Sequence, residues 1–284
     1  MDIAMITCSS FPQLSSDDAL LLPALATRGI TARPLIWNDP AVDWSQPVMS
    51  VLRSPWDYHH QRNAFLDWAE RVSQLHPLWN PLKLLSWNTH KGYLLDLEHQ
   101  GISIIPTQLQ TQGTTINLAT LMQEQNWSEV VIKPAVSASA FETLHVKEET
   151  LAQGQQLLER MLATHDMLIQ PFFPTVISPG ERSLICIDGE ITHAVRRQPA
   201  LAAKQDASIL QEALVIAQED EYRFAQNILA QLPVAPLYAR IDIIRDENNR
   251  LYLMELELVE PGLWLEFAPH AVERFADAIA SKLQ

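Results

Sequence analysis

The first third of the chain alternates between short apolar runs and amphipathic stretches. The apolar runs predict three strands, over residues 3–7, 32–36 and 48–53. Apolar side chains recur at helical spacing between residues 62 and 75, which predicts a helix there. A further helix is expected from an N-cap at Ser16 to a stop at Gly29. Strands separated by helices imply a parallel sheet, in which ligands bind at the carboxyl ends of the strands.

One of these strand ends carries the sequence Arg53-Ser54-Pro55-Trp56-Asp57. A side chain at this position would face the cleft expected between the N-terminal part and the rest of the chain. We therefore predict that Arg53 binds the substrate. The alternative is a surface loop that owes its rigidity to the proline and binds nothing.

Two lysines in the middle of the chain are expected at positions that are unfavourable for a cation without a partner anion. Asn88 is expected to cap a helix that runs to Gln100, and a strand follows at residues 102–106. Lys91 would then lie in the first helical turn, where the helix dipole disfavours a cation. Lys133 interrupts an otherwise apolar strand, EVVIKPAV, and a buried ammonium group needs a partner anion. The alternatives are a solvated Lys91 and a Lys133 whose amine reaches the surface.

The loop after Lys133 has the composition of a phosphate-binding loop. A short helix is predicted over residues 118–125, and the strand that carries Lys133 leads into Ser137-Ala138-Ser139-Ala140. Small side chains let backbone N–H groups approach a phosphate, so we expect Ser137 and Ser139 beside one. The alternative is an ordinary turn.

Short strands and tight turns predict an antiparallel sheet in the last third of the chain. The predicted elements are a strand at 168–173, a hairpin at 181–197 turning at Asp188-Gly189, a helix at 220–231 and a hairpin at 238–258 turning at 246–249.

The last of these hairpins collects three carboxylates. Counted from the centre of its turn, Asp242 faces Leu253 and Arg240 faces Glu255. Asp242, Glu255 and Glu257 then share one face, because side chains alternate along a strand. Like charges this close repel unless a cation joins them, and an all-oxygen site suits Mg²⁺. The alternative is a solvated polar face balanced by Arg240.

Composition narrows the class of protein. The 284 residues are 47% hydrophobic, which is enough for one large core or for two or three packed subdomains. A net charge of −14 argues against nucleic-acid or anionic-membrane binding, because phosphate affinity needs basic clusters. The chain has 2 cysteines, both in apolar strands, which predicts buried free thiols in a cytoplasmic protein. No apolar run approaches the ~18 residues of a membrane span, and no signal peptide is recognised.

Taken in order, these segments resemble the glutathione-synthetase-like branch of the ATP-grasp superfamily, from about Trp79 to the C-terminus. VIKPAVSASAF resembles its strand lysine and phosphate-covering loop, and LIQPFF with GERSLICIDGEITHAVRR resembles its adenine-binding linker and arginine-bearing hairpin. YARIDII with LYLMELELVEPG resembles its metal-binding strands. RSPWDYH and WNTHKGYLLDL are similar to the family of the cyclo-ligase that closes the cycloserine ring.

The resemblance implies an α/β chain with α+β character in its C-terminal part. The implied fold is the ATP-grasp fold, preceded by a Rossmann-like pre-ATP-grasp domain. The implied boundaries are 1–80 for the N-terminal substrate-side domain, 81–168 for the central subdomain and 169–284 for the C-terminal subdomain with the metal site.

The resemblance also assigns roles to individual residues. Lys91, Lys133, Ser137 and Ser139 would contact ATP phosphates, and Gln170 and Phe172 would border the adenine. Arg182, Arg197 and Arg240 would be the catalytic cations, and Asp242, Glu255 and Glu257 would hold Mg²⁺, with Mn²⁺ as an alternative. The chain departs from the family by a loop without glycine and by Glu257 where asparagine is usual. Glu260 has no assigned role.

The implied activity is an ATP-dependent ligation. A carboxylate is activated as an acyl phosphate and joined to an amine or related nitrogen nucleophile, with an amino-acid-like substrate and release of ADP and phosphate. Relatives of this kind are often dimers, so a homodimer is one expected state. The alternatives are an ATP-binding sensor or partner protein without turnover, and a phosphotransferase.

Overall fold

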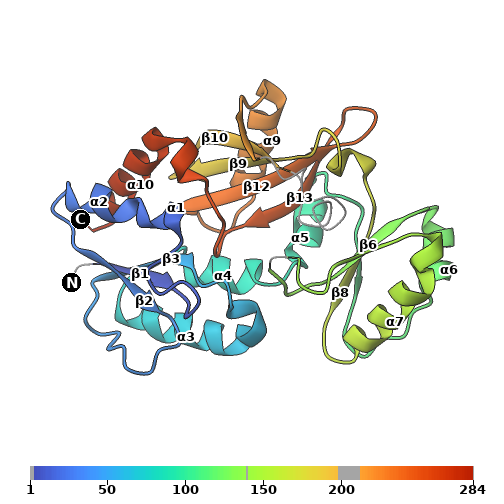
Figure 1. Cartoon of the computed structure of the whole chain (residues 1–284), viewed down its shortest axis with the longest axis horizontal. Helices are drawn as coiled ribbons and strands as arrows, with labels where there is room; N and C mark the ends of the chain where they lie inside the picture. The colour runs from blue at the N-terminus through green and yellow to red at the C-terminus, as the bar shows by residue number, and fades with distance from the viewer. Residues whose placement is uncertain (1–2, 139, 198–211, 284) are drawn as a thin grey trace.

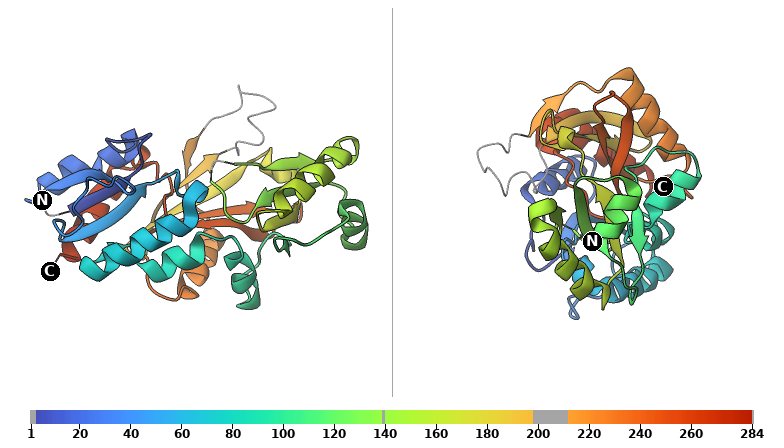
Figure 2. Two further views of the ribbon diagram at one scale, coloured as in Figure 1. Left: turned by 90° about the horizontal axis from the view of Figure 1, so that it is seen from below. Right: turned by 90° about the vertical axis from the view of Figure 1, so that its right-hand side faces the viewer.

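The computed structural model describes residues 3–138, 140–197 and 212–283. Its three sheets follow one another along the long axis of the molecule (Figure 1). The left view of Figure 2 shows the same row from a second side. Parallel strands at one end and antiparallel strands in the other two sheets confirm the predicted fold class. None of the described helices is long and apolar enough to cross a membrane.

The N-terminal sheet is parallel, with the strand order β2-β1-β3-β4. Its strands are β1 (Ile3–Thr7), β2 (Ala32–Ile36), β3 (Met49–Ser54) and β4 (Leu78–Trp79). One face is covered by α3 (Arg62–Leu75), whose Phe65 and Trp68 are buried against Ile6 and Leu52. The predicted bounds of β2 and α3 are confirmed, because both have strong local periodicity.

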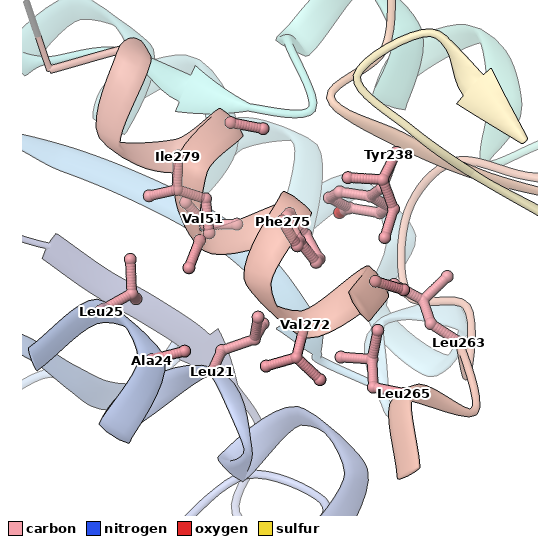
Figure 3. Close-up of a cluster of buried hydrophobic side chains, with 14 of the residues drawn as sticks. Leu21, Ala24, Leu25, Val51, Tyr238, Leu263, Leu265, Val272, Phe275 and Ile279 are labelled. Atoms are coloured by element: carbon pink, nitrogen blue, oxygen red, sulfur yellow. The ribbon is translucent and has the colours of Figure 1, made fainter. Parts of the chain in front are cut away.

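Helices from both ends of the chain cover the opposite face of this sheet. They are α2 (Leu21–Ala26) and α10 (Pro269–Ser281). Figure 3 shows Phe275 and Ile279 of α10 in the same buried cluster as Leu21 and Leu25 of α2. The C-terminal helix therefore stabilises the N-terminal sheet.

The helix predicted from Ser16 to Gly29 is two helices, α1 (Ser16–Ala19) and α2, separated at Leu20. The N-cap is Ser15, whose hydroxyl accepts from the Asp18 amide, so the predicted cap at Ser16 is wrong by one residue.

The second sheet has the order β5-β8-β6-β7, formed by β5 (Gln108–Gln110), β8 (Met167–Pro171), β6 (Val130–Pro134) and β7 (Leu144–Val146). The helices α6 (Leu118–Gln125) and α7 (Leu151–Leu162) pack on one face of it. The bounds predicted for α6 are confirmed.

The third sheet is antiparallel, with the order β11-β10-β9-β12-β13. Its strands are β9 (Glu181–Ile187), β10 (Glu190–Arg197), β11 (Ala213–Val215), β12 (Tyr238–Arg245) and β13 (Leu251–Glu257). The turn between β9 and β10 is the predicted one, with φ of 47° at Asp188 and 79° at Gly189. A turn with positive φ at both central residues favours Asp-Gly, because glycine adopts such angles without a steric clash. The helix α9 (Glu219–Ala230) packs against this sheet.

The predicted helix beginning at Asn88 is wrong. Asn88 ends α4 (Leu82–Asn88), and α5 (Tyr93–His99) begins five residues later. The Asn88 side chain does not cap a helix. Its Nδ2 donates to the Leu256 carbonyl and its Oδ1 accepts from the Leu258 amide, both at 2.8 Å. Asn88 thereby fixes the end of β13.

The predicted strand at residues 102–106 is also wrong. Ile104 makes only an isolated bridge to Leu253, and the strand of this region is β5. Pro106 lacks the N–H that a continued ladder would need, which is consistent with this later start.

An irregular segment, Leu258–Leu263, follows β13 and is here called the junction segment. Each of its carbonyl oxygens accepts a hydrogen bond from a side chain. The donors are Asn80 Nδ2 to Leu258 (2.7 Å), Tyr238 Oη to Val259 (2.8 Å), Trp56 Nε1 to Glu260 (2.9 Å), Arg53 Nη2 to Pro261 (2.7 Å), Arg240 Nη1 to Gly262 (3.3 Å) and protonated His193 Nε2 to Leu263 (2.8 Å). Among the described residues this segment has no strand partner, so side chains supply the donors that a strand would otherwise provide.

The structure contradicts the expectation that Arg53 faces the cleft. Its side chain is fully buried, with Nε 2.8 Å from Asp18 Oδ1 and the guanidinium over the Tyr238 ring. With its hydrogen bond to the junction segment, Arg53 joins the N-terminal sheet to the end of β13. The strand end was predicted to within one residue, because β3 ends at Ser54, but the predicted direction of the Arg53 side chain is wrong.

Replacing Arg53 with methionine should lower the free energy of unfolding by about 3–5 kcal/mol, because Asp18 is left buried without its cation. The measurement is denaturant unfolding followed by circular dichroism. Arg28→Met is the matched control, since Arg28 pairs with the exposed Glu273 and Asp277. It should cost no more than about 1 kcal/mol. Similar small losses in both variants would contradict a structural role for Arg53.

Candidate active site

A cavity of about 540 Å³ lies where residues of the second and third sheets, α4 and the segment with Trp56 and Tyr58 meet. This is within the usual size of a cofactor or small-molecule site. Its apolar lining includes Ile105, Val131, Phe172, Val176, Ile244 and Met254. Its charged lining includes Lys91, Lys133, Glu181, Arg197, Arg240, Glu255, Glu257 and Glu260.

The β12–β13 hairpin supplies most of the acidic groups, in a register different from the predicted one. Asp242 pairs with Glu255 and Arg240 with Glu257, whereas Ile243 pairs with Leu253. The shift leaves Met254 as an extra residue on β13, which is the arrangement of a β-bulge. The predicted register is therefore wrong. The three carboxylates still share one face, because the observed partner of Asp242 lies two residues from the predicted one and a shift of two residues preserves the alternation of side chains.

Asp242 lies at the centre of an ionic network behind the cavity. Its carboxylate accepts from Ser183 Oγ at 2.6 Å, from Arg197 Nη2 at 2.9 Å and from Arg240 Nη2 at 2.9 Å. Burial opposes ionisation, but the charges of Arg240 and Arg197 outweigh it and hold the pKa of Asp242 at about 2. Asp242 is therefore an ionised group that positions two arginines.

Glu257 completes this network from β13. Its Oε1 forms an ion pair with Arg240 Nη2. Burial raises the pKa of Glu257 to about 7 despite Arg240, and the charges of Glu255 and Asp242 add to the shift. The carboxylate thus lies where an additional cation would stabilise its ionised form.

Lys91 connects the loop at Ser137 to β13. Its Nζ is 3.0 Å from Glu255 Oε1 and donates to the Ser137 carbonyl at 2.7 Å. Its backbone amide donates to Ala135 at 2.7 Å. Burial would raise the pKa of Glu255, but Lys91 and Lys133 outweigh it and the pKa lies below its usual value. Lys91 precedes α5 instead of lying in a first helical turn.

Lys133 is a cavity cation without an anion of its own. Among the residues that the structure describes, its ammonium group forms no ion pair within 4 Å. Burial lowers its pKa, and Glu255 opposes that shift. Such an amine is poised for an anionic ligand that enters the cavity.

Gln170 and Phe172, the residues predicted to border the adenine, line the apolar end of the cavity. Gln170 Nε2 donates to Thr107 Oγ1 at 2.8 Å. The Phe172 ring stacks on His145, with centroids 3.8 Å apart and an interplanar angle of 21°. His145 is held in turn by Glu129 at 2.6 Å. Sequence reasoning missed His145, because no local pattern marks it.

The structure contradicts the expectation that Arg182 faces the site. Alternation along β9 directs Glu181 and Ser183 to the cavity side and Arg182 to the other side. There Arg182 lies 2.8 Å from the fully buried Glu221 of α9. Glu181, which was not predicted, forms an ion pair with Arg197 and has a pKa raised to about 7 by burial. The same alternation, counted from the Asp188-Gly189 turn, could have identified it.

The remaining predicted residues have mixed outcomes. Ser137 lines the cavity, with its hydroxyl bonded to the Pro134 carbonyl at 3.0 Å. The expectation for Ser139 lies outside the described residues. Within the described ranges, no group of three or more His, Cys, Asp and Glu side chains is arranged to hold a metal ion. Asp242, Glu255 and Glu257 therefore do not form a ready three-carboxylate site.

Comparison with known proteins identifies the family. A family model described as the N-terminal domain of D-cycloserine synthetase DcsG matches residues 3–80. The cycloserine biosynthesis protein DcsG of Streptomyces lavendulae is 30% identical over 297 residues, covering 99% of this chain and 99% of that protein. The chain belongs to the family of this cycloserine biosynthesis protein.

Solved structures agree with this assignment. The crystal structure of D-cycloserine synthetase DcsG has a TM-score of 0.90 and 28% identity, and the match covers 100% of both chains. The ATP-grasp ligase PsnB, complexed with minimal precursor, Mg and ADP, has a TM-score of 0.66 and 12% identity, covering 99% of this chain and 98% of that chain. The predictions of an ATP-grasp fold and of an ATP-dependent ligase are confirmed.

Arg197 and Arg182 offer a matched pair of substitutions on one hairpin of this ligase. Arg197→Met should lower kcat by roughly 10²–10³-fold, the usual effect of removing one preorganised donor from an active site. Arg182→Met should leave kcat near that of the wild type, because Arg182 does not line the cavity. It should lower the free energy of unfolding, because the buried Glu221 keeps only its ion pair with Arg245 among the described residues. ADP release and denaturant unfolding measure the two effects. Equal losses of kcat would contradict the assignment of the two faces.

Proposed function

We propose that this ligase activates the carboxylate of a small amino-acid-like substrate as an acyl phosphate and forms a C–N bond with a nitrogen nucleophile. The relatives named for cycloserine biosynthesis favour this substrate class. The observation that carries the proposal is the convergence of Lys91, Lys133, Arg197 and Arg240 on one cavity with an apolar end. Such a cavity suits a nucleotide, with its adenine ring at the apolar end and its phosphates at the charged end.

Binding of the nucleotide follows from the two ends of the cavity. We assign the adenine to the region of Gln170 and Phe172, where the stacked His145 makes the wall rigid. The phosphates would then extend toward Lys133 and Lys91. Lys133 lacks an anion among the described residues, so a phosphate would supply the charge that it needs.

Mg²⁺ fits the donor set as a two-carboxylate site. Magnesium in ATP sites is typically held by one or two carboxylates together with phosphate oxygens. Glu255 and Glu257 line the cavity, and each makes its ion pair through Oε1. We propose that these two hold the ion, whereas Asp242 serves through Arg197 and Arg240. A divalent cation bound there would neutralise charge on the transferring phosphoryl group.

The protein's own groups position the reactants and stabilise charge. The substrate carboxylate oxygen attacks the γ-phosphorus, and the bond to the β-phosphate oxygen breaks to release ADP. Arg197 and Arg240, fixed by Asp242, face the oxygens on which charge accumulates. A neutral nitrogen then attacks the acyl carbon, phosphate leaves and the nitrogen loses a proton. No nucleophilic side chain is required.

Trapping with hydroxylamine tests this chemistry. With ATP, Mg²⁺ and a panel of amino acids, an acyl phosphate yields a hydroxamate together with ADP. ADP without hydroxamate would indicate a phosphotransferase, and no ADP with any amino acid, singly or in pairs, would indicate a binding protein. Either result would overturn the proposal.

Lys133→Met should weaken ATP binding by about tenfold or more, because a charge-assisted contact to phosphate is lost. The same change should leave the free energy of unfolding unchanged or higher, since a buried amine becomes apolar. Calorimetric titration with ATP and denaturant unfolding measure the two effects. Lys83→Met, at an exposed position of α4, is the control. Wild-type ATP affinity in Lys133→Met would sink the assignment.

Glu257→Gln should raise the Mg²⁺ concentration for half-maximal ADP release by roughly 10–100-fold, a range typical of weakened metal sites. Mn²⁺ should restore part of the activity, since it binds such sites more tightly than Mg²⁺. Glu98→Gln, at an exposed position of α5, should behave as wild type. An unchanged Mg²⁺ titration in Glu257→Gln would reduce the metal site to Glu255 and phosphates.

A further inference from the structure

Glu260 is the cavity carboxylate to which the proposed reaction gives no task. It lies in the junction segment and lines the cavity, yet among the described residues its carboxylate makes no ion pair. The neighbouring acids differ in this respect, because Glu255 pairs with Lys91 and Glu257 pairs with Arg240.

The backbone at Glu260 is held in place by two buried or partly buried donors. The Glu260 carbonyl accepts from Trp56 Nε1 at 2.9 Å, and the next carbonyl, of Pro261, accepts from the buried Arg53 at 2.7 Å. These two hydrogen bonds fix the backbone from which the Glu260 side chain reaches the cavity, which reduces the ordering that ligand binding would require.

Two aromatic residues of the N-terminal domain border the same end of the cavity. Trp56 and Tyr58 line it with Glu260. Burial raises the pKa of Tyr58 well above its usual value, and the charge of Glu260 adds to that shift. A carboxylate beside aromatic rings forms a favourable environment for a cationic nitrogen, through charge and through the ring faces.

The surroundings of Glu260 disfavour its ionised form unless a further cation is present. Burial and the nearby Glu257 raise the pKa of Glu260 well above its usual value, and Lys91 and Arg240 only partly oppose this. These two cations are already engaged with Glu255 and with Asp242 and Glu257. A ligand that brings its own positive charge would therefore stabilise the ionised carboxylate.

We propose that Glu260, with Trp56 and Tyr58, binds the ammonium group of the amino-acid-like substrate. This inference deepens the proposed function and rests on it. The end of the cavity next to the N-terminal domain would then determine substrate specificity. It would favour amino acids over carboxylic acids that lack an amino group. Lys133 and Glu260 then serve the two opposite charges of the ligands, phosphate and ammonium.

Binding measurements with matched probes test the proposal. The probes are D- and L-alanine with propionate, and D- and L-serine with 3-hydroxypropionate, each titrated calorimetrically into the protein in the presence of ADP and Mg²⁺. We expect at least one amino acid to bind wild type roughly 10–100-fold more tightly than its counterpart without the amino group, the factor of a charge-assisted hydrogen bond.

Glu260→Gln should abolish this preference by weakening only the amino acid, and Glu260→Asp, which keeps the charge, should restore part of it. ADP affinity should not change in either variant, and thermal melting verifies that both are folded. Glu98→Gln is the matched control on an exposed helix face and should keep the full preference.

Three results would overturn the proposal. The first is that no probe with an amino group binds wild type better than its counterpart. The second is that Glu260→Gln keeps the preference. The third is that Glu260→Gln raises the Mg²⁺ requirement and leaves amino-acid affinity unchanged, which would make Glu260 a metal ligand. Ammonium-dependent binding without hydroxamate formation would instead contradict the proposed ligation and leave this site in place.

Discussion

The carbonyl oxygens of the junction segment, Leu258–Leu263, are the constraint on which the active site depends. A buried carbonyl without a donor costs about 1–3 kcal/mol, so each donating side chain must be in position before the segment is stable. The donors come from the N-terminal part, from β10 and from β12. The N-terminal sheet thus helps to form the active site, because Arg53 and Trp56 fix the residues that follow the acidic strand.

The same constraint explains why a fully buried arginine is present in a parallel strand. Arg53 is neutralised by Asp18 and stacked on Tyr238, and its Nη2 donates to the Pro261 carbonyl. Breaking such a pair is costly, whereas its net contribution to stability is small compared with a well-packed apolar core. Its contribution is better described as geometric, since it fixes the distance between two parts of the chain that together enclose the cavity.

The sequence predicted the bounds of those helices and strands that depend on residues within a single segment. The strand at 32–36 and the helices at 62–75 and 118–125 have their predicted bounds, because each depends on periodicity within one segment. Side chains that bind distant backbone were not predictable in this way. Asn88 has the composition of a helix cap but binds β13, some 170 residues away in the sequence. The register of β12 and β13 depends on an extra residue at Met254 that alternation alone does not reveal.

The departure at Glu257 can be understood from its partner across the strands. Where the resemblance leads one to expect a neutral asparagine, this chain has a carboxylate directly opposite Arg240. Arg240 therefore contacts two acids, Asp242 on its own strand and Glu257 on the next. A third acid would be unfavourable in an isolated hairpin, but here the arginine shares its charge between them and still lines the cavity. The extra carboxylate and the arginine are thus one feature, and neither is explained without the other.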